Sequence, residues 1–211
     1  MVMDVSGQFD LEQRDGAFQA LKDLGDCCVG VEAWSQACEY YLQASALAPG
    51  EAGPFVGLGA VAYQTGQYEQ ARADFTTALR KDSACAQAYG GLAMVYQHQG
   101  HHASAFDCYL RCLELDGDNL VALLGLFQTS CQMGTFAKII HFLEVYLSRH
   151  GQDTSVLFCL ASLYARDAQY DNAARSLEAV LRAEPDKADA ASLLAEVRER
   201  TGGKPCGGGG R

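Results

Sequence analysis

A leucine recurs every 34 residues along most of this chain. Its six positions are Leu24, Leu58, Leu92, Leu126, Leu160 and Leu194. A repeat of about 20 to 50 residues marks a chain made of stacked copies of one supersecondary unit, in which each copy buries its apolar face only against its neighbours. We therefore expect an array of repeated units rather than a single core.

Other positions keep the same register and show what each unit is. The residue after the leucine is small in most copies, as at Gly25, Gly59 and Ala93. A second set lies thirteen residues after each leucine and reads Ala37, Ala71, Ala105, Ile139 and Ala173. Aromatic or bulky residues flank this set at helical spacing, so each unit carries two apolar stripes. The spacing predicts two helices per unit, which approach closely where the small residues lie.

This pattern of Leu-Gly, aromatic, Ala, aromatic and Pro resembles the tetratricopeptide repeat (TPR) family place by place. The resemblance implies an all-α fold, a right-handed α-solenoid of five helix-turn-helix units (the TPR array, 18–201) closed by a C-terminal capping helix. The repeats and the cap are 18–51, 52–85, 86–119, 120–153, 154–187 and 188–201.

The ends of the helices and of the chain have their own signals. Gly66, Gly100 and Gly134 fall where a first helix should end in left-handed backbone, and Pro54 falls in a first turn, where its missing N–H is harmless. Residues 1–17 are expected to form an N-terminal arm or a partial helix. Residues 202–211 form a Gly-rich tail that is expected to be disordered, since it has little to bury.

The expected helices follow from the repeat register. They span 18–31, 34–47, 52–65, 68–81, 86–99, 102–115, 120–133, 136–149, 154–167, 170–183 and 188–201.

Charge and cysteine content limit the partners and the compartment. The 211 residues carry a formal net charge of −10, and residues 1–51 hold nine acids and two bases, or −7 of it. An acidic chain repels phosphate backbones and anionic lipid, so we expect no nucleic-acid partner and no membrane insertion. Of the nine cysteines, eight are scattered through helical sequence and Cys206 lies in the Gly-rich tail, so they form no disulfide framework. Buried thiols of this kind, together with an N-terminus that lacks a basic and apolar leader, predict a cytoplasmic location.

The resemblance implies that the first helices of the units line a concave groove. In related proteins such a groove binds an extended peptide or a partner helix. At the equivalent positions this chain offers Lys22, Asp26, Val56, Gly57, Ala60, Tyr63, Gly90, Gly91, Met94, Gln97, Leu124, Gly125, Gln128, Phe158 and Ser162. We expect these residues to bind a protein or peptide partner that presents apolar anchors.

Two features of that groove can be interpreted from the residues. The clamp with which some TPR proteins hold a C-terminal carboxylate is excluded, because only Lys22 matches it and Asp26 replaces its asparagine. Gly57, Gly90, Gly91 and Gly125 lie on one face of the first helices and have two interpretations of equal weight. They open space for a partner, or they permit close packing within the stack.

The sequence offers no local support for catalysis, a cofactor or a metal. It contains no phosphate-binding loop, nucleophile elbow, zinc-protease motif or dinucleotide fingerprint. Cys108 and Cys112 lack zinc spacing and are expected in the core, and His98, His101 and His102 have no further ligand nearby. The sequence therefore predicts a protein-interaction module, an adaptor or scaffold. Two alternatives stay open, a self-assembling scaffold that homo-oligomerises through its N-terminal region and an accessory subunit of an enzyme on another chain.

Overall fold

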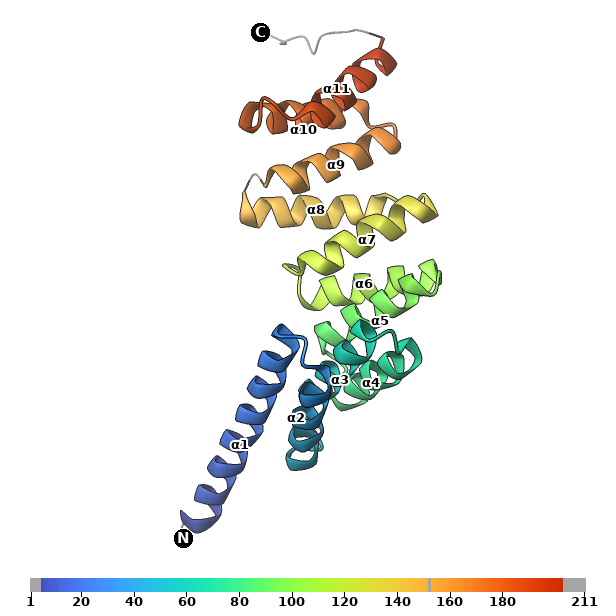
Figure 1. The fold of residues 1–211 in the computed structure, drawn as a ribbon. Coiled ribbons are helices and arrows are strands. Elements are labelled where there is room, and N and C mark those ends of the chain that lie inside the picture. The colour runs from blue at the N-terminus through green and yellow to red at the C-terminus, as the bar shows by residue number, and fades with distance from the viewer. Residues whose placement is uncertain (1–4, 152, 203–211) are drawn as a thin grey trace. The chain divides into compact units, whose positions relative to one another are not determined.

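The computed structural model describes residues 5–151 and 153–202, and every regular element in them is an α-helix (Figure 1). The prediction of an all-α fold is confirmed for these residues. The helices are α1 (Val5–Gly30), α2 (Trp34–Leu47), α3 (Gly53–Gln64), α4 (Tyr68–Lys81), α5 (Ala86–His98), α6 (His102–Leu115), α7 (Leu120–Met133), α8 (Ala137–His150), α9 (Thr154–Arg166), α10 (Tyr170–Ala183) and α11 (Ala188–Arg200). In the described ranges no helix is both long and apolar enough to cross a membrane. Residues 203–211 of the Gly-rich tail lie outside these ranges.

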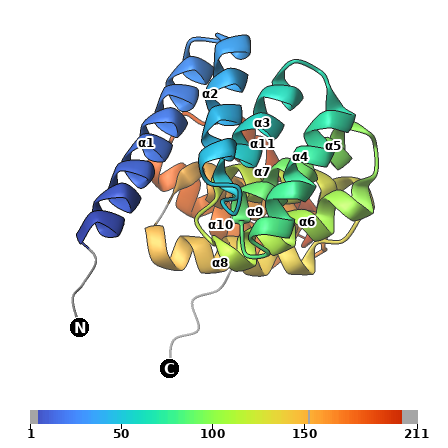
Figure 2. The same cartoon turned by 90° about the horizontal axis from the view of Figure 1, so that it is seen from below.

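The chain divides into two compact units, residues 1–125 and 126–211, and α7 contributes to both. In the first unit α1 packs on α2, α3 on α4 and α5 on α6, and the pairs join through α2 with α3 and α4 with α5 (Figure 2). In the second unit α8 packs on α9, α9 on α10 and α10 on α11. Within each unit these helices contact their neighbours in sequence, as expected for an array.

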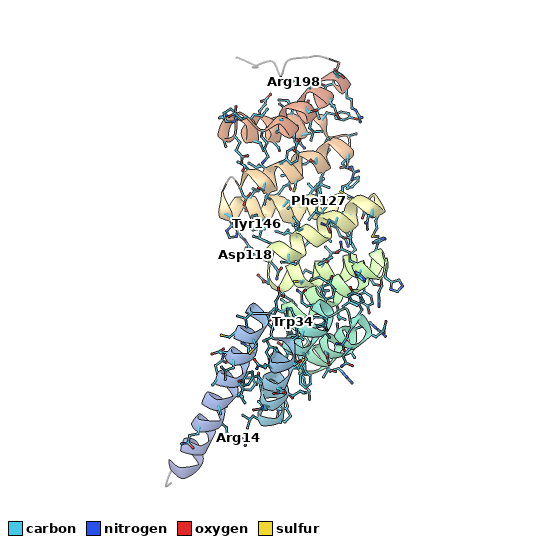
Figure 3. All side chains as sticks on the ribbon, in the orientation of Figure 1. Arg14, Trp34, Asp118, Phe127, Tyr146 and Arg198 are labelled. Carbon is cyan, nitrogen blue, oxygen red and sulfur yellow. The ribbon has the colours of Figure 1, made fainter. Side chains whose placement is uncertain are left out.

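The first helix begins earlier than the repeat register suggests. Residues 5–17, expected as an arm or partial helix, form the N-terminal half of α1 without a break at residue 18. Glu12, Gln13 and Ala17 are good helix formers, and Gly16 within the helix opposes them by only about 1 kcal/mol. Arg14, labelled in Figure 3, donates a hydrogen bond of 3.1 Å from Nη2 to the Leu47 carbonyl oxygen. This bond links α1 to the last turn of α2, where carbonyl groups lack helical partners.

The turns between paired helices share one backbone conformation. Gly66, Gly100 and Gly134 have φ angles of 76°, 76° and 68°, which confirms the left-handed helix ends predicted from the glycines. The positions one period earlier and later, Glu32 and Ala168, have φ angles of 58° and 57°. The repeat therefore imposes left-handed backbone at this place even where the residue carries a Cβ.

The core is built from the small and the aromatic positions of the repeat. Ala37, Ala71, Ala105 and Ala173 of the second helices are fully buried, as is Ile139 at the same place. The leucines of the 34-residue ladder are buried from Leu92 onward, as at Leu92, Leu126, Leu160 and Leu194. Leu24 is 46% exposed on α1, which packs within the first unit mainly against α2 and α3.

Candidate functional site

Three helices of the first unit present one apolar face. On α3, Val56, Ala60 and Tyr63 are spaced by four and three residues, so they lie on one side of the helix. On α5, Gly90, Met94 and Gln97 repeat that spacing, and on α7 it is continued by Val121 and Leu124. We call this surface the α3–α5–α7 groove and define it by Val56, Ala60, Tyr63, Met94, Val121 and Leu124.

The groove contains two hollows, of about 310 and 350 Å³. Both are lined by Tyr63, Met94 and Val121, so they are continuous with each other. The first is completed by Val56, Ala60, Gln64, Phe75, Gln87, Gly90, Gly91 and Asn119. The second is completed by Gln97, His98, Tyr109, Leu124 and Gly125. Val121 and Leu124 are 61% and 56% exposed, which leaves large apolar side chains uncovered at the edge of the groove.

The structure therefore brings together most of the predicted groove residues of the first unit. They are Val56, Ala60, Tyr63, Gly90, Gly91, Met94, Gln97, Leu124 and Gly125. Their helical positions were readable from the sequence because the repeat register is unbroken. That they bind a partner remains a prediction.

The glycines of this face are occupied from within the fold. A Cβ added to Gly57 would lie 2.5 Å from Cζ of Tyr41, and one added to Gly125 would lie 2.1 Å from Cζ of Tyr109. At Gly91 it would lie 2.3 Å from Cζ of Phe75. In each case an aromatic ring from the preceding second helix lies where the Cβ would be. Close packing within the stack therefore accounts for Gly57, Gly91 and Gly125, and the glycines do not open space for a partner's backbone there.

Gly90 differs from its neighbour Gly91. A Cβ on Gly90 would make only an ordinary contact, at 3.5 Å from Sγ of Cys112. Gly90 lines the first hollow, and for this glycine the interpretation that it opens space for a partner stays a prediction.

Lys22 and Asp26, predicted as groove residues on the first helix, are engaged in the fold. Lys22 Nζ lies 3.3 Å from Asp26 Oδ2, and the Tyr41 hydroxyl donates a hydrogen bond of 2.7 Å to Asp26 Oδ1. Burial, followed by this hydrogen bond, raises the pKa of Tyr41 far above its usual value. Asp26 thus orients the Tyr41 ring, which packs on Gly57. Lys22 and Asp26 line neither hollow of the groove.

Gln128, Phe158 and Ser162 belong to the second unit. The Lys187 Nζ lies 5.6 Å from the centroid of the Phe158 ring. Ser162 lines a separate hollow of about 450 Å³ between α9 and α11, together with Arg166, Tyr170 and Arg200. The predicted fifth-unit positions are therefore partly covered by a lysine and partly placed in a more polar hollow.

Three residues that line the groove were not predicted from the sequence, namely Phe75, Tyr109 and Asn119. Phe75 and Tyr109 come from the second helices, and a groove lined by first helices did not predict them. Asn119 stands in the turn before α7, where its Oδ1 accepts a hydrogen bond of 3.0 Å from the Ala122 amide. An asparagine directly before a periodic apolar run is a helix-capping signal that could have placed it.

The chemistry of the groove suits contact rather than reaction. Its lining includes no carboxylate, lysine, arginine or cysteine, and its one imidazole, His98, stacks on the Tyr68 ring at a centroid distance of 3.9 Å. The Tyr109 hydroxyl donates a hydrogen bond of 2.6 Å to Gln97 Oε1, and burial raises the pKa of this phenol. In the part of the chain that the structure describes, no three His, Cys, Asp or Glu side chains gather in a metal-binding arrangement.

Cys108 and Cys112 lie in and beside the core. Cys112 is fully buried and Cys108 packs against the core around Phe75. Burial raises the pKa of both thiols to about 11.

Comparisons with known proteins agree with this architecture. The sequence model described as tetratricopeptide repeat matches residues 56–119 and 160–203, which is just over half of the chain. Tetratricopeptide repeat protein 7B of Homo sapiens is 30% identical over 84 residues, and this match spans 40% of the chain but only 10% of the human protein.

Solved structures share the fold at lower identity. YrrB, described as a TPR protein with an unusual peptide-binding site, is 21% identical with a TM-score of 0.69, over 79% of this chain and 86% of its own. PilF of Pseudomonas aeruginosa is 21% identical with a TM-score of 0.65, over 91% and 95% of the two chains. MamA is 20% identical with a TM-score of 0.63, over 82% and 94%.

Proposed function

The chain belongs to the tetratricopeptide repeat family, and on that premise we propose that it is a non-catalytic protein-interaction module whose α3–α5–α7 groove binds an amphipathic helix of a partner protein. The observation that carries this proposal is the exposure of Val121 and Leu124, at 61% and 56%, beside two continuous apolar hollows. Full burial of such a side chain contributes roughly 1.5 to 3 kcal/mol. A partner that covers Val121 and Leu124 therefore gains this free energy on binding, because both side chains are exposed in the first unit.

An amphipathic helix fits the geometry better than a charged segment. The hollows share Tyr63, Met94 and Val121, so a ligand can place successive apolar side chains into them without crossing a charged group. A helix presents such anchors at intervals of three and four residues. Gln64 and Gln87 supply hydrogen-bonding groups among the lining residues, which orient a ligand rather than hold it.

The acidic first helix favours a partner with a basic end. Asp15, Asp23 and Asp26 lie on α1, and residues 1–51 carry a net charge of −7. Such a field mainly raises the association rate of a basic segment and depends on ionic strength. We place the module in the cytoplasm, because the eight cysteines in the described residues are all free thiols, as in reducing compartments.

The proposal is tested by charge introduced at exposed positions. The double variant Val121→Lys with Leu124→Lys places two cations in the groove at sites whose exposure leaves folding nearly unchanged. Its matched control is Leu115→Lys on α6, because Leu115 is 40% exposed and lines neither hollow. Native host proteins that co-purify with the tagged full chain are compared by quantitative mass spectrometry among wild type, the double variant and the control.

We expect at least one partner that is retained by wild type and the control and is lost, by about tenfold or more, from the double variant. Equal retention by all three proteins contradicts the groove as the binding surface. Light scattering of the three purified proteins separates self-association from binding of another protein. If a second copy of the chain occupies the groove, the molar mass of the double variant is lower than that of wild type and of the control.

A further inference from the structure

A further hollow, outside the α3–α5–α7 groove, lies on a different side of the first unit. It measures about 450 Å³ and lies between α2 and α4 over α3. Its α3 residues, such as Leu58 and Ala62, lie on another face of that helix than Val56 and Ala60 of the α3–α5–α7 groove. This hollow and the α3–α5–α7 groove can therefore be occupied independently.

Short side chains at three repeat positions account for this hollow. Ser35, Cys38 and Thr65 line it, and the residues one period later are Glu69, Arg72 and Gln99. There Gln99 Nε2 donates a hydrogen bond of 2.9 Å to Glu69 Oε1, and Arg72 Nη2 lies 2.6 Å from Glu69 Oε2. One repeat later, these long side chains thus bridge the place that corresponds to the hollow, which stays open between α2 and α4.

The walls of the hollow are mainly apolar and partly uncovered. Leu42 is 56% exposed, and Trp34 and Leu58 are half-buried. Trp34, the only tryptophan of the chain, stands at the start of α2 and is labelled in Figure 3.

One carboxylate stands among these apolar walls. Asp74 on α4 is half-buried and accepts hydrogen bonds of 3.1 Å from Gln70 Nε2 to both of its oxygens. Within the described residues no lysine, arginine or histidine forms an ion pair with it. Burial raises the pKa of Asp74, and the nearby carboxylate contributes to a raised pKa of Cys38. A partly desolvated carboxylate without a cation is a place where an incoming cation gains more than at the open surface.

We propose that this hollow binds a peptide segment of a partner protein that carries an arginine beside an apolar residue. The aliphatic stem of an arginine packs on apolar walls while its guanidinium forms two hydrogen bonds with a carboxylate, here that of Asp74. The ring of Trp34 offers a further favourable surface to the guanidinium, because tryptophan is the best aromatic partner for a cation. The apolar neighbour of the arginine covers Leu42 and Leu58. This site is separate from the groove of the proposed function.

Trp34 makes the test direct, since its fluorescence reports on this hollow alone. The probe is the acetylated and amidated peptide Leu-Arg-Leu, titrated into the full chain, with the same peptide carrying citrulline in place of arginine as the neutral control. We expect a saturable change in Trp34 emission, and binding weaker by about tenfold or more for the citrulline peptide.

Variants of the protein complete the cycle. Asp74→Asn should weaken the arginine peptide by about tenfold and leave the citrulline peptide unchanged. Glu39→Gln, which removes an exposed acid on α2 outside the hollow, should change neither, and so controls for net charge. Leu42→Asn should weaken both peptides. The double groove variant Val121→Lys with Leu124→Lys should bind both as wild type does, so failure of this site and failure of the groove are distinguishable.

Three results would overturn the proposal. They are the absence of a saturable change in Trp34 emission with the arginine peptide, equal affinity for the arginine and citrulline peptides, and equal loss of affinity in Asp74→Asn and Glu39→Gln.

Discussion

The ring of Phe75 occupies the place where a side chain on Gly91 would stand. A Cβ on Gly91 would lie 2.3 Å from Cζ of Phe75, which is far inside van der Waals contact. Phe75 belongs to α4 and Gly91 to α5, sixteen residues later. Tyr41 with Gly57 and Tyr109 with Gly125 repeat the relationship at the same separation. Successive repeats of the first unit are thus joined by the same contact, in which an aromatic ring of one repeat packs on a glycine of the next. We call this contact the joint.

This joint predicts opposite effects for two adjacent glycines of α5. Gly91→Ala should destabilise the protein by about 1 to 3 kcal/mol, because Phe75 is 97% buried and its ring must move within a packed core. Gly90→Ala should be neutral or stabilise by up to about 1 kcal/mol, since its Cβ has room and alanine favours the helix. Urea denaturation of the two variants, followed by circular dichroism, measures the difference. Equal midpoints for both would contradict the account of the joint.

The shared left-handed turn predicts a gain from glycine where the chain lacks it. Ala168 has a φ of 57°, and such backbone is unfavourable by about 1 to 2 kcal/mol for a residue with a Cβ. Ala168→Gly should therefore stabilise the protein by about 0.5 to 1 kcal/mol, after the greater freedom of glycine in the unfolded chain is subtracted.

Gly66→Ala is the reverse experiment at the same place of another unit. A Cβ on Gly66 would meet nothing within 4 Å, so any loss of stability comes from the backbone conformation alone. Thermal midpoints of both variants and wild type are the measurement. A loss on Ala168→Gly, or no loss on Gly66→Ala, would show that the turn does not require its conformation.

The environment of Asp74 predicts how its contribution to stability depends on pH. Its pKa in the native state is raised by burial, so the native state binds the proton more tightly than the unfolded chain, in which the pKa is about 3.9. The contribution of Asp74 to the free energy of unfolding therefore falls as pH rises from that value through the native pKa. At neutral pH the Asp74 carboxylate is charged, and burial makes this charged form less favourable in the native state than in the unfolded chain. Cys38 on α2 and Gln70 on α4 face it, and the α3 residues that line this hollow are uncharged.

Asp74→Asn should accordingly be more stable than wild type at pH 7, and the difference should shrink as the pH approaches 4. Urea denaturation at pH 7, 6, 5 and 4 measures it. A variant that is less stable than wild type at pH 7 would mean that the charged carboxylate is stabilised by a partner in the fold.

The buried thiols predict a graded pattern of alkylation. Cys112 is fully buried with a pKa of about 11, so at pH 8 its thiolate fraction is about a hundredfold below that of an ordinary thiol. Cys27 is exposed on α1. Iodoacetamide at pH 8 should modify Cys27 first and Cys112 only when urea unfolds the chain, as read by peptide mass spectrometry. Comparable rates for the two residues in the native protein would contradict the burial of Cys112.

Much of this fold could be predicted because one period fixes both helix positions and buried faces. The ranges 34–47, 68–81, 102–115 and 170–183 expected from the register coincide with α2, α4, α6 and α10. For residues 5–17 the prediction left an arm and a partial helix open, because these residues lie before the first copy of the pattern. Left-handed Glu32 and Ala168 were not predicted either, since the signal for that conformation is a glycine.

The candidate site was predictable only in part, for a related reason. Helical register shows that Tyr63, Met94 and Leu124 share a face, and the structure places all three at continuous hollows. Register within a helix does not show which ring from another helix reaches a given glycine, so the roles of Gly57, Gly91 and Gly125 could not be settled. The hollow beside Trp34 depends on the absence of long side chains, which a pattern of matching residues does not reveal.

Site-specific photo-crosslinking in the native host tests whether the α3–α5–α7 groove holds a partner helix. The photoreactive amino acid benzoylphenylalanine replaces Val121 in one protein and Leu115 in another, both at exposed positions. We expect a discrete adduct with one other protein from position 121, none from position 115, and attachment within an amphipathic helical segment of that partner. Adducts of equal yield from both positions, or none from position 121, would contradict a partner helix in this groove.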